Sequence, residues 1–278
     1  MARLTDEQFW NEGYETTSRS LGRRMRRVLL GVARRVLSSN TYSEYHLWRR
    51  MLPRYLSEAK GKRAIEIGSA PGDFLVRLFH TFGVIPYGVD YAETGVALNR
   101  KTFLANGLNP EQVIHADFFS DGFLDQFRHR FDIVISRGFI EHFSDPKEVV
   151  RRHAELLGPG GLLLINIPNV RGINLRLQSW LRPEVIPLHN LEIMDLKSFH
   201  SLFDVEGLES HFCGYQGMFD WCLFNVGPNR FLQAVRMIGK GTQALLSPLL
   251  IAIFRNHPIE HRSVSPYLWF IGRMTPSR

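Results

Sequence analysis

The chain has 278 residues, 44% of them hydrophobic, which is enough to bury one substantial core with some appendages. Its 34 basic and 27 acidic residues give a net charge of +7, which permits an anionic substrate or a membrane surface but does not indicate nucleic acid as a partner. The two cysteines, Cys213 and Cys222, lack the spacing of a zinc site or a disulfide framework, and the polar N-terminal sequence lacks the apolar region of a secretion signal. We therefore expect a cytoplasmic protein with no bound metal.

The first 60 residues are predicted to form an N-terminal arm and a helical cap. The arm, residues 1–20, is polar and carries the aromatic residues Phe9, Trp10 and Tyr14. Exposed aromatic side chains usually pack against something, which favours an ordered arm, although a loosely attached tail fits the same pattern.

A helical pattern follows the arm. In residues 21–36 apolar side chains recur on one face of a helix, and arginines occupy the other faces. Such a basic amphipathic helix either caps the following domain or lies on an anionic membrane. A second helical stretch, residues 45–59, leads into the remainder of the chain.

From Lys62 onward, strand and helix patterns alternate, which predicts a parallel sheet with helices on both faces. The expected strands are 63–68, 86–89, 112–115, 131–136 and 162–167, with helices at about 72–82, 92–106, 121–128 and 146–157.

The last hundred residues contain two long connections. Residues 168–195 are expected to be irregular, and their length is typical of a binding lid. A helix at 191–203 and strands at 208–217 and 266–273 follow. The segment between those strands, about 218–264, is an apolar insertion that could enclose a bulky substrate, contact a membrane, form a dimer interface or simply pack on the core. Its longest apolar run, 244–254, is interrupted by Ser247-Pro248 and is too short to span a bilayer.

A glycine-rich turn follows the first expected strand, with the sequence Glu66-Ile67-Gly68-Ser69-Ala70-Pro71-Gly72. Its two glycines keep Cβ atoms out of a tight strand-to-helix turn, so a nucleotide-like ligand can lie against the backbone at the helix N-terminus. A turn with no ligand would need the same glycines. Ala70 stands where the dinucleotide-binding fingerprint G-x-G-x-x-G has its second glycine, which argues against a nicotinamide cofactor.

Two more acidic residues follow the next two expected strands. Asp90 can accept hydrogen bonds from both ribose hydroxyls of an adenosyl group. Asp117 can accept one from the adenine amine, with Phe118 against the ring. Alone, each aspartate is most often a helix cap or a solvated loop residue. Together with Glu66, they place three acids at three successive strand ends, which favours an adenosyl-containing ligand.

These motifs, with Ile140-Glu141-His142-Phe143 and Leu157-Gly158-Pro159-Gly160-Gly161, occur in an order that resembles the class I S-adenosylmethionine (SAM)-dependent methyltransferases of the small-molecule type, including the ubiquinone-biosynthesis O-methyltransferases. The resemblance covers about residues 60–170. It implies a Rossmann-like α/β domain over residues 61–278, with a seven-stranded, mostly parallel sheet, an antiparallel last strand and SAM as the cofactor. The implied cofactor contacts are Glu66, Gly68, Ser69, Ala70, Gly72, Asp90, Tyr91, Asp117, Phe118, Ser136 and Arg137.

The predicted reaction moves the methyl group of SAM to a small-molecule acceptor, with a hydroxyl as the expected nucleophile. His189, in the expected lid, is the candidate general base; His142 competes for that role and Glu141 adjoins it. His189 could equally be a turn histidine bonded to backbone, and Arg137 could be a surface ion pair. The candidate acceptor contacts are Tyr14, Arg137 and Asn190.

Several alternatives stay open at this point. N- or C-methylation of a small or lipid-like acceptor is the nearest one, and a nicotinamide-dependent oxidoreductase or a non-catalytic SAM-binding protein are alternatives of other classes. A nucleic-acid methyltransferase is disfavoured, because the fourth strand is not followed by an Asn/Asp-Pro-Pro-aromatic motif and no nucleic-acid-binding module is visible. The expected partners are a small molecule and, through 218–264, a membrane face or a second copy of the chain.

Overall fold

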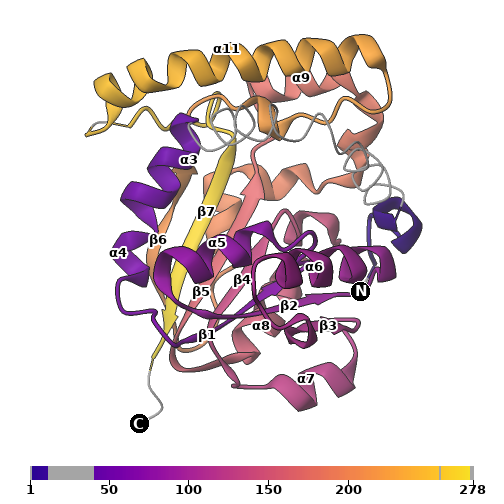
Figure 1. Ribbon diagram of the computed structural model, residues 1–278, viewed down its shortest axis with the longest axis vertical. Helices are drawn as coiled ribbons and strands as arrows, with labels where there is room; N and C mark the ends of the chain where they lie inside the picture. Colours follow the sequence, from indigo (N-terminus) through magenta and orange to yellow (C-terminus); the bar gives the residue numbers. More distant parts are fainter. Residues whose placement is uncertain (1, 12–40, 257, 276–278) are drawn as a thin grey trace.

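A seven-stranded sheet forms the centre of the protein, as the computed structural model shows for residues 2–11, 41–256 and 258–275 (Figure 1). Its spatial order is β3-β2-β1-β4-β5-β7-β6. Strands β1 to β5 are parallel to one another, and β7 runs antiparallel to both β5 and β6. The strands are β1 (Arg63–Ile67), β2 (Ile85–Asp90), β3 (Val113–His115), β4 (Phe131–Arg137), β5 (Leu157–Pro168), β6 (Leu208–Gln216) and β7 (Tyr267–Met274). This arrangement confirms the predicted Rossmann-like fold.

Helices connect the strands. The longer ones are α5 (Asp73–Phe82), α6 (Glu93–Ala105), α7 (Asp121–Phe127), α8 (Pro146–Glu155), α9 (Ile173–Leu181), α10 (Leu196–Ser201) and α11 (Arg230–Phe254). Short helical segments are α3 (Tyr42–His46), η1 (Leu47–Met51), α4 (Pro53–Leu56), η2 (Pro110–Gln112), η3 (Ile140–His142), η4 (Pro183–Leu188), η5 (Leu191–Met194) and η6 (Trp221–Leu223). Residues 7–11 are helical as well.

Two apolar cores cover the two faces of the sheet, because successive side chains of a strand point to opposite faces. On β4, Ile133 and Ile135 belong to one core and Val134 to the other. The first core is closed by η1, α4, α5 and α6 and the second by α7, α8 and α10. Burial on both faces explains why these strands read as nearly continuous apolar runs.

The two long connections differ from the sequence prediction. Residues 168–195 are mostly helical rather than irregular, since they contain α9, η4 and η5. The helix expected at 191–203 is divided, because the Asp195 carboxylate accepts a hydrogen bond from the Lys197 N–H at 3.0 Å and so caps a new helix, α10.

The apolar insertion also departs from its prediction. Residues 244–254 do not stand alone but form the second half of the 25-residue helix α11, which continues through Pro248. By length and composition α11 could cross a membrane. The expectation that the apolar segment in this region is too short to span a bilayer was therefore wrong. Only 11% of its most apolar stretch is buried. In Figure 1 the helix runs along one end of the molecule, above the end of β5 and the start of β7.

The described part of the N-terminal arm contacts the loop after β4. Arg3 forms a bridge with Phe143, and the Leu4 N–H donates to the His142 carbonyl at 2.8 Å. The Trp10 indole meets the His142 ring edge to face, with centroids 5.2 Å apart. Residues 2–11 therefore fit the ordered alternative. Tyr14 and the helix expected at 21–36 lie outside the described residues.

Candidate active site

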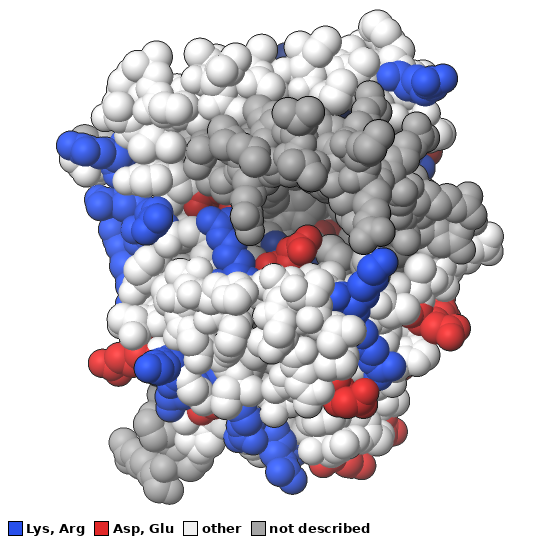
Figure 2. All heavy atoms as spheres, in the orientation of Figure 1, with Lys and Arg blue, Asp and Glu red and all other residues white. Residues whose placement is uncertain are grey.

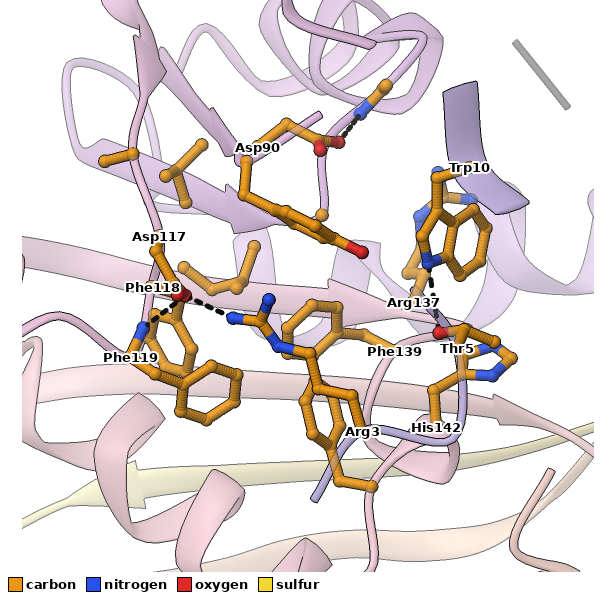
Figure 3. A pocket seen from close by; sticks show the side chains of 18 residues that line it. Arg3, Thr5, Trp10, Asp90, Asp117, Phe118, Phe119, Arg137, Phe139 and His142 are labelled. Carbon is orange, nitrogen blue, oxygen red and sulfur yellow. Dashed lines mark hydrogen bonds and ion pairs between the residues drawn. The ribbon is translucent and has the colours of Figure 1, made fainter. Parts of the chain in front are cut away.

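Two adjoining cavities open beside the carboxyl ends of β1 and β4, where the strand order reverses. We call them the cofactor cavity and the acceptor cavity, after the contacts that the sequence predicts there. The cofactor cavity is lined by Arg3, Thr5, Trp10, Ile67, Gly68, Ala70, Val89, Asp90, Tyr91, Ala116, Asp117, Phe118, Phe119, Arg137, Gly138, Phe139, His142 and Phe143 (Figure 3).

The turn after β1 needs its two glycines for different reasons. Gly68 has φ +68°, and a Cβ built there would lie 2.8 Å from the Phe139 ring, so the backbone itself forms the cavity wall. Gly72 has φ +91°, and a Cβ there would lie 2.1 Å from Asn99 Oδ1. Gly72 thus lets α5 begin against α6 and does not line the cavity.

Asp90, at the end of β2, is buried at the cavity edge. Its carboxylate accepts hydrogen bonds from the N–H groups of Ala70 at 3.3 Å and Ala92 at 3.0 Å. Burial raises the pKa of Asp90, and these backbone donors oppose that rise. The hydrogen bonds fix the carboxylate against the β1 turn, where it can accept a pair of vicinal hydroxyls.

Asp117, after β3, is engaged by the N-terminal arm. Arg3 Nη2 lies 2.6 Å from Asp117 Oδ1, and the Arg3 guanidinium lies 4.6 Å from the centroid of Tyr91 (Figure 3). The same aspartate oxygen accepts the Phe119 N–H at 2.9 Å. Phe118 is buried beneath them, with its ring 4.8 Å from that of His153. The arm therefore forms one wall of the cofactor cavity.

Glu66 and Arg137 form an ion pair beneath both cavities. Arg137 Nε donates to Glu66 Oε1 at 2.9 Å, and its guanidinium lies 3.9 Å from the centroid of the Phe74 ring. Glu66 is fully buried and does not line either cavity, whereas Arg137 is about one-third exposed and lines both. Burial raises the pKa of Glu66, and the Arg137 charge opposes this rise.

The acceptor cavity is enclosed by the helical segment after β5 and by the insertion. Its lining residues are Phe9, Trp10, Arg137, Gly138, Glu141, His142, Asn166, Pro168, Val170, Gln178, Val185, Ile186, His189, Cys222, Leu223, Asn225 and Tyr267. The Gln178 side chain on α9 ties the two walls together, because it donates to the Asn225 carbonyl at 3.0 Å and accepts the Asn225 N–H at 3.1 Å. Within the insertion, Trp221 fixes the segment before α11 to that helix, because its indole packs on Gly239, where a Cβ would lie only 2.3 Å from the ring.

All three predicted catalytic residues meet at the acceptor cavity. Glu141, His142 and His189 each place one ligand-type atom within 4.8 Å of the others. Burial lowers the pKa of His142 to about 4 and also lowers the pKa of His189, so both imidazoles are neutral at pH 7. Burial raises the pKa of Glu141 to about 8. The sequence did not predict that these residues lie together, because His142 and His189 are 47 positions apart.

The structure divides the predicted cofactor contacts into two groups. Gly68, Ala70, Asp90, Tyr91, Asp117, Phe118 and Arg137 line the cofactor cavity, whereas Glu66, Ser69, Gly72 and Ser136 lie behind its surface. Ser69 Oγ accepts a hydrogen bond from Asn99 at 2.6 Å, and the buried Ser136 Oγ has no hydrogen-bond partner among the described residues.

Of the predicted acceptor contacts, Arg137 lines the acceptor cavity and Asn190 does not. The Asn190 carboxamide accepts the Glu192 N–H at 3.1 Å, and its backbone N–H donates to the Glu141 carbonyl at 2.7 Å. The sequence reasoning missed Arg3 and Thr5 as lining residues. The aromatic residues of the arm were the signal that this segment packs on the domain.

Comparison with known proteins agrees with this architecture. Residues 41–211 match the family model described as a methyltransferase domain. Curated relatives include the ubiquinone biosynthesis O-methyltransferases of Idiomarina loihiensis, 29% identical over 47% of this chain and 50% of the relative, and of Stutzerimonas stutzeri, 28% identical over 39% and 45%. The chain thus aligns with about half the length of the curated relatives it matches.

Solved structures resemble the fold at lower identity. Phosphoethanolamine N-methyltransferase 2 of Haemonchus contortus, in complex with SAM, has a TM-score of 0.54 at 17% identity, covering 87% of this chain and 55% of that one. A structure described as a putative sarcosine dimethylglycine methyltransferase of Galdieria sulphuraria has a TM-score of 0.51 at 15% identity, covering 84% and 85%.

Proposed function

Because the chain belongs to the methyltransferase-domain family, we propose that it is a SAM-dependent methyltransferase acting on a small-molecule acceptor, with a hydroxyl as the nucleophile. When bound, SAM supplies an electrophilic methyl group. The chain must hold the acceptor in line with that group and exclude water. The observation that carries the proposal is the joining of two cavities that share Trp10, Arg137, Gly138 and His142.

The residues of the cofactor cavity fit SAM. Gly68 presents bare backbone where a Cβ would have no room, and the buried Asp90 carboxylate lies beside it as an acceptor for hydroxyls. Asp117 and Phe118, after the next strand, offer an acceptor and an aromatic ring to a purine. Asp90 would hold the ribose and Asp117 the adenine amine.

His189 is the proposed general base for the acceptor hydroxyl. Its Nδ1 lies 2.7 Å from the Val185 carbonyl oxygen, which leaves Nε2 to take a proton. His142 is oriented similarly, with Nδ1 2.8 Å from the Leu188 carbonyl oxygen, but it is more deeply buried. A half-buried imidazole can pass its proton to solvent more readily, which favours His189.

The first test is calorimetric titration of the whole chain with S-adenosylhomocysteine, with NAD and NADP as parallel controls. We expect micromolar binding of S-adenosylhomocysteine alone. Binding of a nicotinamide cofactor instead would overturn the function and leave the fold intact. An acceptor screen with SAM then distinguishes O-methylation from N- and C-methylation, which are the alternatives for the same cavities.

The base is tested by two single substitutions. His189→Ala should slow methylation with little change in S-adenosylhomocysteine affinity, because His189 lines only the acceptor cavity. If His142→Ala alone has this effect, the assignment of the base is wrong.

The exposed face of α11 is the proposed contact for a membrane surface or a second copy of the chain. Its exposed apolar residues are Phe231, Met237, Ile238, Leu245, Leu246, Leu249 and Ile253. Figure 2 shows mainly uncharged surface along this edge of the molecule. Flotation with anionic vesicles tests the first partner and light scattering after size-exclusion chromatography tests the second; Leu245→Glu should abolish whichever association occurs.

A further inference from the structure

We infer that Glu141, His142 and His189 form a binding site for one divalent transition-metal ion, such as Zn²⁺, that opens into the acceptor cavity. Glu141 and His142 belong to η3, after β4, and His189 directly follows η4. The chain brings them together because the Asn190 N–H donates to the Glu141 carbonyl, which draws the segment after η4 onto η3. Among the described residues this is the group with the ligand types and spacing of a metal site.

The two histidines are oriented as metal ligands usually are. Nδ1 of each ring faces a backbone carbonyl oxygen, at 2.8 Å for His142 and 2.7 Å for His189. A carbonyl oxygen can only accept, so Nδ1 carries the proton and the lone pair is on Nε2. Metal-binding histidines are held in this way by a contact at the other ring nitrogen, which fixes the tautomer and the direction of the ring.

Glu141 provides the independent observation. Its side chain is 1% exposed, and neither carboxylate oxygen has a hydrogen-bond partner among the described residues. In the part of the chain that the structure describes, its ion-pair partner within 4.0 Å is His142 Nε2, at 3.8 Å, which is too long for a hydrogen bond. Buried polar atoms are normally hydrogen-bonded or bound to a metal, because an unsatisfied buried polar group is costly. A bound cation would satisfy both oxygen atoms and stabilise the ionised carboxylate.

The distances fit a shared ion with little movement. Zinc–ligand distances of about 2.1 Å place the ligand atoms of a tetrahedral site about 3.4 Å apart. The Glu141–His142 separation of 3.8 Å and the 4.8 Å limit for all three atoms mean that ligand atoms must approach one another by at most about 1.4 Å. Two imidazoles and one carboxylate suit Zn²⁺, Fe²⁺ or Co²⁺ better than Mg²⁺ or Ca²⁺, which prefer oxygen ligands.

Three protein ligands leave at least one coordination position open, and all three line the acceptor cavity. An acceptor hydroxyl bound at that position would become more acidic and release its proton to water, while its oxygen keeps the electron pair. His189 would then hold the ion rather than accept the proton. This role rests on the proposed function, whereas ion binding itself does not.

The experiment measures binding directly. The whole chain, freed of any affinity tag and treated with a chelator, is titrated with Zn²⁺, and bound metal is counted by elemental analysis after dialysis. We expect one ion per chain with micromolar or tighter affinity. Glu141→Gln, which keeps the shape of the side chain, should weaken binding at least tenfold, and so should His189→Gln.

Two control variants separate the site from other zinc ligands. Glu192→Gln removes an exposed carboxylate near the same loop, and Cys222→Ser removes the thiol that lines the acceptor cavity. Both should retain full affinity. Co²⁺ added to the wild-type chain should give ligand-field absorption bands that Glu141→Gln alters.

The result that overturns the inference is a wild-type chain that binds Zn²⁺ no more tightly than Glu141→Gln and His189→Gln. S-adenosylhomocysteine titration of the same samples reports their folding and keeps the two proposals distinct. If the chain binds the cofactor but not zinc, only the proposed metal site is refuted. If it binds zinc but not the cofactor, only the proposed function is refuted.

Discussion

The buried histidine behind the cofactor cavity should make the stability of the fold depend on pH. His153, on α8, is completely buried and packs against Phe118 and Phe139. Its Nδ1 lies 2.7 Å from the Val149 carbonyl oxygen, and Nε2 has no hydrogen-bond partner among the described residues. Burial lowers the pKa of His153 to about 4. The perturbation is His153→Gln, which removes the titrating group.

The direction in which stability changes with pH depends on whether the folded or the unfolded chain binds the proton more tightly. Because the folded-state pKa of His153 is below that of the unfolded chain, about 6.5, the neutral form favours folding above pH 6.5. As the pH falls below 6.5, the unfolded chain binds a proton that the folded chain does not, and the free energy of unfolding drops by about 1.4 kcal/mol per pH unit. Between pH 7.5 and pH 5 the loss from His153 is about 2 kcal/mol, and it levels off near pH 4.

The assay is urea unfolding at pH 7.5, 6 and 5. His153→Gln should lower stability at pH 7.5, yet lose about 2 kcal/mol less than the wild type between pH 7.5 and pH 5. The control is His200→Gln, an exposed histidine on α10. Parallel stability curves for the wild type and His153→Gln would refute the reasoning, because the burial of this ring would then have no electrostatic cost.

Three further substitutions test the site and the insertion. Asp90→Ala should weaken S-adenosylhomocysteine binding by at least tenfold in calorimetry without unfolding the chain, since it removes an ionised hydrogen-bond acceptor; unchanged affinity would remove the ribose assignment. Gly68→Ala should cost about 1–3 kcal/mol more in urea unfolding than Gly107→Ala, because both have positive φ but only the first meets a side chain. Gly239→Ala should loosen α11 and speed proteolysis of the insertion, whereas Gly241→Ala, in open space on the same helix, should stabilise it by up to about 1 kcal/mol; equal proteolysis rates would contradict the packing argument.

The sequence was most informative where a physical rule links residue order to position in space. Parallel strands buried on both faces produce apolar runs, so the strand positions could be predicted. Their carboxyl ends share one edge, so Asp90 and Asp117 were expected at one cavity, which they line. What each of these residues binds stays a prediction.

Contacts between distant segments could not be predicted in this way. Glu141 and His189 meet only because η4 turns back onto η3, and no local pattern encodes that turn. Pro248 was interpreted as a break in an apolar run, yet α11 continues through it. The ends of the helix are held from outside: Asn229 caps its start, and the Tyr42 hydroxyl donates to the Phe254 carbonyl at 3.3 Å.

Glu66 illustrates how a motif residue can serve a ligand without touching it. The resemblance implied a cofactor contact, but Glu66 lies behind the cavity and reaches it only through Arg137. An unpaired guanidinium in the wall shared by both cavities would repel the positively charged sulfonium of SAM. Pairing with Glu66 offsets that charge in surroundings where Coulomb interactions are strong.

The two forms of the cofactor separate this electrostatic role from a structural one. SAM carries the sulfonium charge and S-adenosylhomocysteine does not, although the two are otherwise nearly alike in shape. Glu66→Gln leaves Arg137 uncompensated, so SAM affinity should fall several-fold more than S-adenosylhomocysteine affinity when both are titrated by calorimetry at low salt. An equal loss for both ligands would mean that Glu66 only shapes the turn, since a purely structural defect cannot distinguish a charged sulfur from a neutral one.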